Sequence, residues 1–435
     1  MKPSIRKKQH RAKNRLAATG ACLGMIAGTG FSAHAQSDTN SVAIAQLEQQ
    51  NQALQQQLNT LEDMAKKAGI MPSGANADPP VSAMSNFSLS GFVQTSYFYN
   101  AERPAGGYSA GYLWNTKDNN FSINKVKITL ASPPAERSGD EWSAGYRVSL
   151  MAGEDAPALD SGYGSPGGAF DYLREAYVDL NVPIGQGLNV KAGELISLLN
   201  YESGDGGAAN ENFSQGYQWW FTGNGPAAGV QLDYAFTDWL DVKFRVSNGL
   251  YVGPVSTTSN KGLMGTIGLK PNAKSWVNLT GFGGEGSGTT DVDGGEVLAG
   301  YQITDKLGTG FEGDYFDFLP EDESAKELWS VGGWIWYDFT PKIGLAFRAD
   351  FLDDKNGGEI KGALPAAPAE YTGIGYDDPT VDHGTLDSYT LTLNLKPTPN
   401  IIIQPEVRYD TTSYAGGFNG RDFQFILGCG ASYLF

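Results

Sequence analysis

The chain has 435 residues, a formal net charge of −17 at pH 7 and 12% aromatic residues. The acidic balance excludes the basic surface with which proteins bind nucleic acid. Beyond the first 35 residues, one histidine, His383, and one cysteine, Cys429, remain. They are too few for a histidine- or cysteine-based metal centre, and we expect neither a metal ion nor a cofactor.

Residues 1–35 predict a cleaved signal peptide. Seven basic residues and no acidic one accompany a Gly/Ala-rich apolar stretch from Leu16 to Phe31, and Ala33-His34-Ala35 fits a cleavage site. A transmembrane anchor is the alternative, but the stretch is short and glycine-rich for a membrane span. Loss of those seven basic residues takes the net charge from −17 to −24.

Residues 36–70 predict a short periplasmic helix. Its apolar positions alternate three and four residues apart, which is typical of a coiled-coil seam. The seam residues are Ile44, Leu47, Asn51, Leu54, Leu58 and Leu61. A buried Asn51 would favour one register and a parallel association, and we expect a homotrimer. A solvated, unassociated tether is the alternative. Residues 71–85 are rich in Pro, Gly, Asn and Ser and predict a flexible linker.

Residues 86–435 predict an all-β fold, a transmembrane antiparallel β-barrel of about 16 strands. Alternating apolar and polar segments recur along this whole region. They are separated in turn by short connections, such as 183–186 and 304–306, and by long ones, such as 198–225, 284–292 and 353–384. An even number of strands leaves both ends of the barrel on one side, which export through the periplasm makes the periplasmic side. A barrel of this size encloses a water-filled lumen.

The final segment, Phe425 to Phe435, alternates apolar and polar residues and ends on an aromatic residue. With Tyr433 and Phe435 it resembles the closing strand of bacterial outer-membrane barrels. That resemblance implies that these two residues form an assembly signal read by the barrel-assembly machinery.

Several strand motifs carry a wider resemblance. Gly91-Phe-Val-Gln-Thr-Ser-Tyr97, Tyr146-Arg-Val-Ser-Leu-Met151, Leu173-Arg-Glu-Ala-Tyr-Val178 and Gly187-Leu-Asn-Val-Lys-Ala-Gly193 are similar to those of the OmpL-like outer-membrane β-barrel porin family. The likeness covers most of the chain after the linker. It implies a channel for small hydrophilic solutes or ions, set among outer-membrane lipids in a Gram-negative bacterium, and leaves the solute open.

Alternation also predicts which charged residues face the lumen. If Val126, Ile128 and Leu130 face lipid, Lys125 and Lys127 face inward, since a charge on the lipid side costs roughly 2–4 kcal/mol at the membrane midplane. The predicted basic wall consists of Lys125, Lys127, Arg147, Lys191, Lys243 and Arg245.

The connection 198–225 is a candidate pore constriction. We hypothesise that it folds into the barrel, where its acids Glu202, Asp205 and Glu211 face the basic wall and create a field across the opening. The alternative is a loop that stays outside with solvated acids. Its aromatic residues, Tyr217, Trp219 and Trp220, are predicted either to stack sugar rings or to pack the root of the loop.

Three functions follow from these patterns. The leading one is an outer-membrane porin for passive diffusion, without enzymatic activity. The alternative is a non-conducting structural or adhesive outer-membrane barrel that displays acidic loops. The third, a barrel hydrolase, would depend on His383, the one histidine after the leader.

Overall fold

The computed structural model describes residues 87–104, 107–112, 114–159, 170–256, 258–287, 290–321, 324–356 and 383–435. The predicted signal peptide, the coiled-coil seam (Ile44, Leu47, Asn51, Leu54, Leu58 and Leu61) and the linker lie outside the described residues and stay predictions. Among the described residues, no helix has the length and apolar character needed to cross a membrane.

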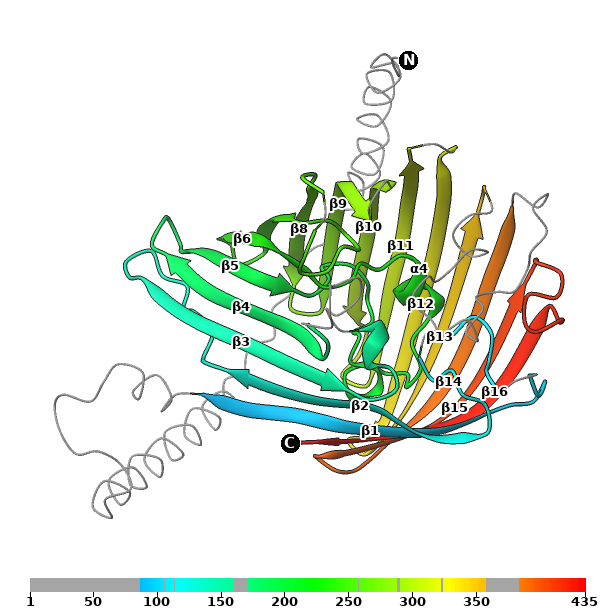
Figure 1. The fold of residues 1–435 in the computed structure, drawn as a ribbon. Helices are drawn as coiled ribbons and strands as arrows, with labels where there is room; N and C mark the ends of the chain where they lie inside the picture. The colour runs from blue at the N-terminus through cyan, green and yellow to red at the C-terminus, as the bar shows by residue number, and fades with distance from the viewer. Residues whose placement is uncertain are drawn as a thin grey trace, which may run out of the picture. The chain divides into compact units, whose positions relative to one another are not determined.

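Sixteen strands account for most of the described chain (Figure 1). They are β1 Ser88–Asn100, β2 Asn120–Ala131, β3 Ser143–Ala152, β4 Leu173–Val182, β5 Leu188–Leu195, β6 Ala227–Thr237, β7 Leu240–Ser247, β8 Gly262–Asn272, β9 Ser275–Ser287, β10 Thr290–Gln302, β11 Leu307–Pro320, β12 Lys326–Thr340, β13 Ile343–Asp354, β14 Gly384–Thr398, β15 Ile401–Thr412 and β16 Phe423–Leu434. Within the described residues, three short helices lie between them: η1 Ala156–Ala158, η3 Gly206–Ala208 and α4 Tyr217–Phe221.

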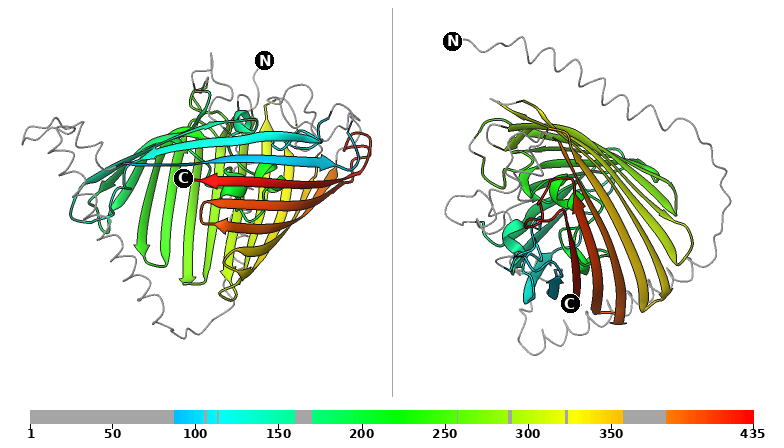
Figure 2. Two further views of the ribbon diagram at one scale, coloured as in Figure 1. Left: turned by 90° about the horizontal axis from the view of Figure 1, so that it is seen from below. Right: turned by 90° about the vertical axis from the view of Figure 1, so that its right-hand side faces the viewer.

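The strands form one closed antiparallel barrel, in which each strand pairs with its neighbours in sequence. The first and last strands close it: Phe92 pairs with Leu434 and Asn100 with Ile426, and the backbone of Gly91 exchanges hydrogen bonds of 2.9 and 3.0 Å with Phe435. The left view of Figure 2 shows β1, in blue, and β16, in red, side by side. Closure leaves no sheet edge unpaired, as a strand protein in lipid requires. The predicted 16-stranded barrel is therefore confirmed.

The two faces of the wall differ as the alternation predicts. On β2, Ile128 and Leu130 are exposed outward, whereas Lys125, Lys127 and Thr129 are buried inside. A β-bulge in the pairing of β1 with β2, between Gln94 and Thr95, also turns the neighbouring Asn124 inward. Apolar side chains thus cover the outer surface, and polar ones line the lumen.

The two ends of the barrel also differ. Tight turns join β6 to β7, β12 to β13 and β14 to β15, and exposed Phe236, Trp239, Tyr337 and Phe339 lie beside them. At the other end Phe121, Trp329, Phe351 and Phe423 are exposed. Such aromatic bands mark the two membrane–water interfaces of outer-membrane barrels.

Two connections depart from the expected lengths. The link between β2 and β3, residues 132–142, is longer than the other turns at its end of the barrel. The long connection expected at 284–292 is mostly strand, because β9 continues to Ser287 and β10 resumes at Thr290. Tyr433 and Phe435 are exposed on the outside, 51% and 48% respectively. Their role as an assembly signal stays a prediction.

Candidate functional site

The connection between β5 and β6, residues 196–226, folds into the lumen, and we call it the inner loop (Figure 1). It carries η3 and α4, and Asn212, Phe213, Ser214 and Gln215 in its middle are almost fully buried. A buried loop must satisfy its own backbone donors. The loop meets this demand with carboxylates of the barrel wall.

Four wall carboxylates from four strands accept backbone N–H groups of the inner loop. Glu296 of β10 accepts from Asn200 at 2.6 Å, and Glu312 of β11 accepts from Tyr201 at 2.8 Å. Asp350 of β13 accepts from Tyr217 at 2.6 Å, and Glu406 of β15 accepts from Phe213 at 2.8 Å. These four bonds satisfy backbone donors at four points of the loop and hold it along its length.

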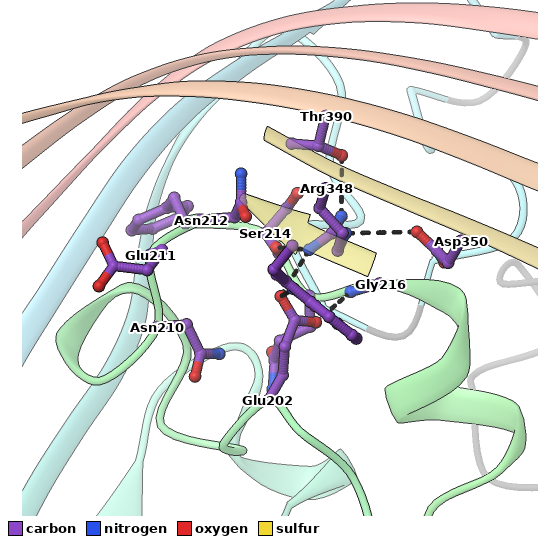
Figure 3. Close-up of polar contacts among 12 residues, drawn as sticks. Glu202, Asn210, Glu211, Asn212, Ser214, Gly216, Arg348, Asp350 and Thr390 are labelled. Atoms are coloured by element: carbon purple, nitrogen blue, oxygen red, sulfur yellow. Dashed lines mark hydrogen bonds and ion pairs between the residues drawn. The ribbon is translucent and has the colours of Figure 1, made fainter. Parts of the chain in front are cut away.

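Arg348 of β13 is the centre of a buried network of ion pairs and hydrogen bonds (Figure 3). Its Nη1 donates to Glu202 Oε1 at 2.8 Å and to the carbonyl oxygen of Ser214 at 2.6 Å. Its Nη2 donates to Thr390 Oγ1 at 2.8 Å, and Asp350 lies 3.3 Å from its Nε. The other oxygen of Glu202 accepts from the backbone N of Gly216 at 2.6 Å. Every charge in this group therefore has a buried partner.

Arg408 of β15 holds the next part of the loop. Its guanidinium pairs with Asp410 at 2.7 Å and donates to the carbonyl oxygen of Gln215, also at 2.7 Å. It contacts two tyrosine rings, 4.5 Å from the centre of Tyr112 and 4.7 Å from that of Tyr217. Because Tyr112 belongs to the connection between β1 and β2, this first loop also packs inside the barrel against the inner loop.

The three predicted constriction acids have different surroundings. Asp205 pairs with Lys127 of the predicted basic wall at 2.7 Å. Glu202 instead pairs with Arg348 on β13, outside that wall. Glu211 points away from the Arg348 network (Figure 3), and burial raises the pKa of its carboxyl. One of the three acids thus faces the predicted basic wall as an ion pair.

The six predicted basic residues also divide into two groups. Three contact the inner loop: Lys127 as above, Lys125 through Gln215 at 3.4 Å, and Arg245 through the carbonyl oxygen of Ile196 at 2.8 Å. The other three are engaged within the wall. Arg147 pairs with Glu175 at 2.6 Å, Lys243 lies 3.8 Å from Asp241, and Lys191 lies over the Tyr177 ring at 5.4 Å.

A group of three wall carboxylates was missed by the sequence analysis. Oxygens of Glu296, Glu312 and Asp314 all lie within 4.8 Å of one another, and all three residues are buried. Their described donors are neutral: Asn200 donates to Glu312 at 2.9 Å, and Gln218 donates to Asp314 at 3.0 Å. Carboxylates this close share protons or hold a hard cation. The spacing of Glu312 and Asp314, two residues apart on one strand face, was the available signal.

The aromatic residues of α4 pack the loop. Tyr217 is 1% exposed, Trp219 meets Trp114 edge-on at 4.6 Å, and Trp220 stacks on Phe221 at 4.5 Å. Of the two roles predicted for these residues, packing within the loop agrees with this geometry.

Comparison with known proteins assigns the family. A family model described as "Putative beta-barrel porin-2, OmpL-like" matches residues 86–435. The chain belongs to this OmpL-like porin family. It is an outer-membrane porin, and family and fold together favour a channel rather than an enzyme. The resemblance drawn from the strand motifs is thereby confirmed.

Solved structures support the same fold. The outer-membrane channel DcaP of Acinetobacter baumannii is similar with a TM-score of 0.51 and 13% identity, over 80% of this chain and 97% of that one. OmpT of Vibrio cholerae in its trimer form is similar with a TM-score of 0.51 and 11% identity, over 80% of this chain and 99% of that one. An anion-selective porin from Comamonas acidovorans is similar with a TM-score of 0.50 and 11% identity, over 80% of this chain and 99% of that one. No curated protein matches the chain.

Proposed function

We propose that this porin is a passive channel whose narrowest section lies between the inner loop and the wall formed by β3 to β8. The observation that supports this is the anchoring of the loop. Its carboxylate bonds go to β10, β11, β13 and β15, so the loop leaves β5 and crosses toward the opposite side of the lumen. Solutes would then pass along the side from which the loop departs.

Exposure identifies the charged residues of this passage. The side chains of Arg147 and Lys243 are 37% and 29% exposed, and Lys191 is half-buried. Lys125 and Arg348, by contrast, have side chains that are 2% and 0% exposed, and they serve to hold the loops. We therefore assign the field that solutes meet to Arg147, Lys191 and Lys243, and we assign Glu202 to anchoring rather than to filtering.

Planar-bilayer recording tests the channel and its field together. Wild-type protein should open in uniform steps, and Arg147→Gln/Lys191→Gln/Lys243→Gln should shift the reversal potential in a salt gradient toward cations. We expect the ratio of anion to cation permeability to fall about twofold or more, since charges lining a narrow opening act through low-dielectric walls. Removal of three lysines in or next to the tight turns (Lys306→Gln/Lys342→Gln/Lys396→Gln) is the matched control and should have little effect.

Two outcomes contradict the proposal. Equal shifts in the two triple variants would place the field at the mouth instead of the passage. Folded wild-type protein that never conducts would favour a non-conducting structural barrel, with the loops inside acting as a plug.

The assembly and orientation are also proposals. We propose a homotrimer joined by the helix of residues 36–70, with both ends of the barrel in the periplasm. In support, the start of β1 and the end of β16 meet at the same end of the barrel as the tight turns. Light scattering of the purified porin with and without residues 36–70 tests the trimer, and loss of the trimer in the shortened chain is expected.

A further inference from the structure

A second feature of the lumen lies beside Tyr201, one of the anchored residues of the inner loop. A pocket of about 370 Å³ opens on the inner side of β8 to β12, near the turn that joins β8 to β9. We propose that this pocket binds a small carboxylate carried on a flat ring, as a solute on its way through the channel. The proposal rests on the proposed function, since it names the class of solute that the channel takes.

The floor of the pocket follows from strand register. Trp276 of β9 pairs with Gly300 of β10, Gly300 pairs with Gly310 of β11, and Gly310 pairs with Trp334 of β12. Two glycines thus lie between two tryptophans in one row across the wall. A Cβ on Gly300 would overlap the Trp276 ring, so this ring lies flat over the glycine. Beside the row, Trp336 covers Gly308 in the same way.

These tryptophans face the lumen rather than the membrane. Trp276 and Trp336 have the strand positions that turn inward with buried Thr280 and Ser330. Both rings are half-buried, which leaves aromatic surface open to the lumen. The usual role of barrel tryptophans, in a band at the lipid interface, therefore does not explain them.

Tyr201 of the inner loop closes the pocket on one side. Its ring stacks on Trp334 at 4.5 Å and lies nearly parallel to Trp276, with 11° between the planes and 6.0 Å between the centres. Burial raises the pKa of Tyr201 to about 12, so the hydroxyl stays neutral at physiological pH. A neutral ring adds apolar surface without repelling an anion. The lining of the pocket thus already includes a tyrosine ring nearly parallel to a tryptophan ring.

Positive charge lies at the other side of the pocket. Lys270 and Lys274, at the end of β8 and in the turn after it, line the pocket. Both lysines are exposed, and within the described part of the chain neither ammonium group has a hydrogen-bond or ion-pair partner. A carboxylate on a ring stacked over Trp276 or Trp336 would meet these charges. An uncharged ring or an anion without a ring would use only half of the site.

Blockage of single-channel current by benzoate tests this inference. Benzoate is expected to reduce the current of the wild-type porin in a saturable manner, and propionate and benzyl alcohol should bind at least about tenfold more weakly, since each lacks one of the two interactions. Glucuronate carries its carboxylate on a puckered pyranose ring, whose C–H face can also pack on tryptophan, and it serves to separate sugar acids from aromatic acids. Binding of glucuronate as strong as that of benzoate would assign the site to sugar acids, and weaker binding to aromatic acids.

Three variants locate the binding. Trp276→Leu/Trp336→Leu keeps apolar bulk without flat rings, and Lys270→Gln/Lys274→Gln removes the charges. Each should weaken benzoate about tenfold. The matched control, Lys306→Gln/Lys342→Gln, removes two turn lysines outside the pocket and should leave binding unchanged. Equal binding of propionate and benzoate, or unchanged benzoate affinity in both pocket variants, would overturn the inference.

Failure of this inference is separable from failure of the channel proposal. A porin that conducts without benzoate blockage refutes the pocket alone. For a porin that does not conduct, calorimetric titration of the purified protein with benzoate decides the inference directly. Saturable binding lost in Lys270→Gln/Lys274→Gln would support the site, and no binding would reject it.

Discussion

The two sides of the lumen use the same kinds of charged residue in different ways. On β13 and β15, Arg348 and Arg408 are buried, and each donates to a carbonyl oxygen of the inner loop. Arg348 also pairs with Glu202 of that loop, and Arg408 pairs with Asp410 of its own strand. On β3 and β7, Arg147 and Lys243 pair with acids of their own wall and keep part of their surface exposed. The comparison separates charges that hold the loop from charges that a passing solute can meet.

Loss of an anchoring charge should have the largest effect. Arg348→Met leaves Glu202 and Asp350 buried without their cation, and breaking a buried pair in this way costs about 3–5 kcal/mol. We expect the amides of Gly216 and Tyr217 to lose most of their protection in hydrogen exchange. Lys243→Met, at a partly exposed pair, should cost about 1 kcal/mol or less. Similar losses in the two variants would contradict the distinction between the two sides.

A change in the packing of the inner loop against the wall should have the second largest effect. A Cβ on Gly430 of β16 would overlap the ring of Phe213, whereas a Cβ on Gly281 would meet no atom within 4 Å. Gly430→Ala should therefore destabilise the loop by about 1–3 kcal/mol, as overpacking of a filled interior does. Thermal unfolding in detergent and hydrogen exchange measure this effect. Gly281→Ala is the matched control, and equal behaviour of the two variants would show that the loop adapts freely.

A smaller change is expected at the one ion pair between the inner loop and the predicted basic wall. Asp205→Asn leaves Lys127 without its anion, so the lumen gains one uncompensated positive charge. The reversal potential should move toward anions, by less than the opposite shift of the triple variant. Asp238→Asn, in an exposed turn, provides the control. A shift toward cations would exclude this account.

The smallest effect concerns pH. Burial raises the pKa of Glu211 in the folded state, so its contribution to stability is complete below its ordinary pKa and is lost as pH rises through the raised value. In the Glu211→Gln variant the side chain cannot ionise, so this loss of stability at higher pH does not occur. The Tm of the variant relative to the parent should thus increase between about pH 4 and about pH 8. A constant difference across this range would show that the carboxyl titrates normally in the folded protein.

Sequence patterns were most informative where the controlling forces are local. Alternation placed Lys125 and Lys127 on the inner face, where both are buried in the structure. It did not place Asn124 there, because the bulge that turns this residue inward depends on the pairing of β1 with β2. The same limit applies to Glu296, which joins Glu312 and Asp314 only when β10 and β11 pair.

The sequence by itself determined the class of fold and the two faces of each strand. It also pointed to the connection that folds into the lumen. These features follow from the two-residue period of a strand and from the cost of charges in lipid. Only the tertiary structure decided the partners. Glu202 meets Arg348 across 146 positions, and Trp276 meets Gly300 through strand register. Closure of the barrel and the path of the inner loop set these pairs, because both depend on the summed contacts of many strands rather than on any one segment.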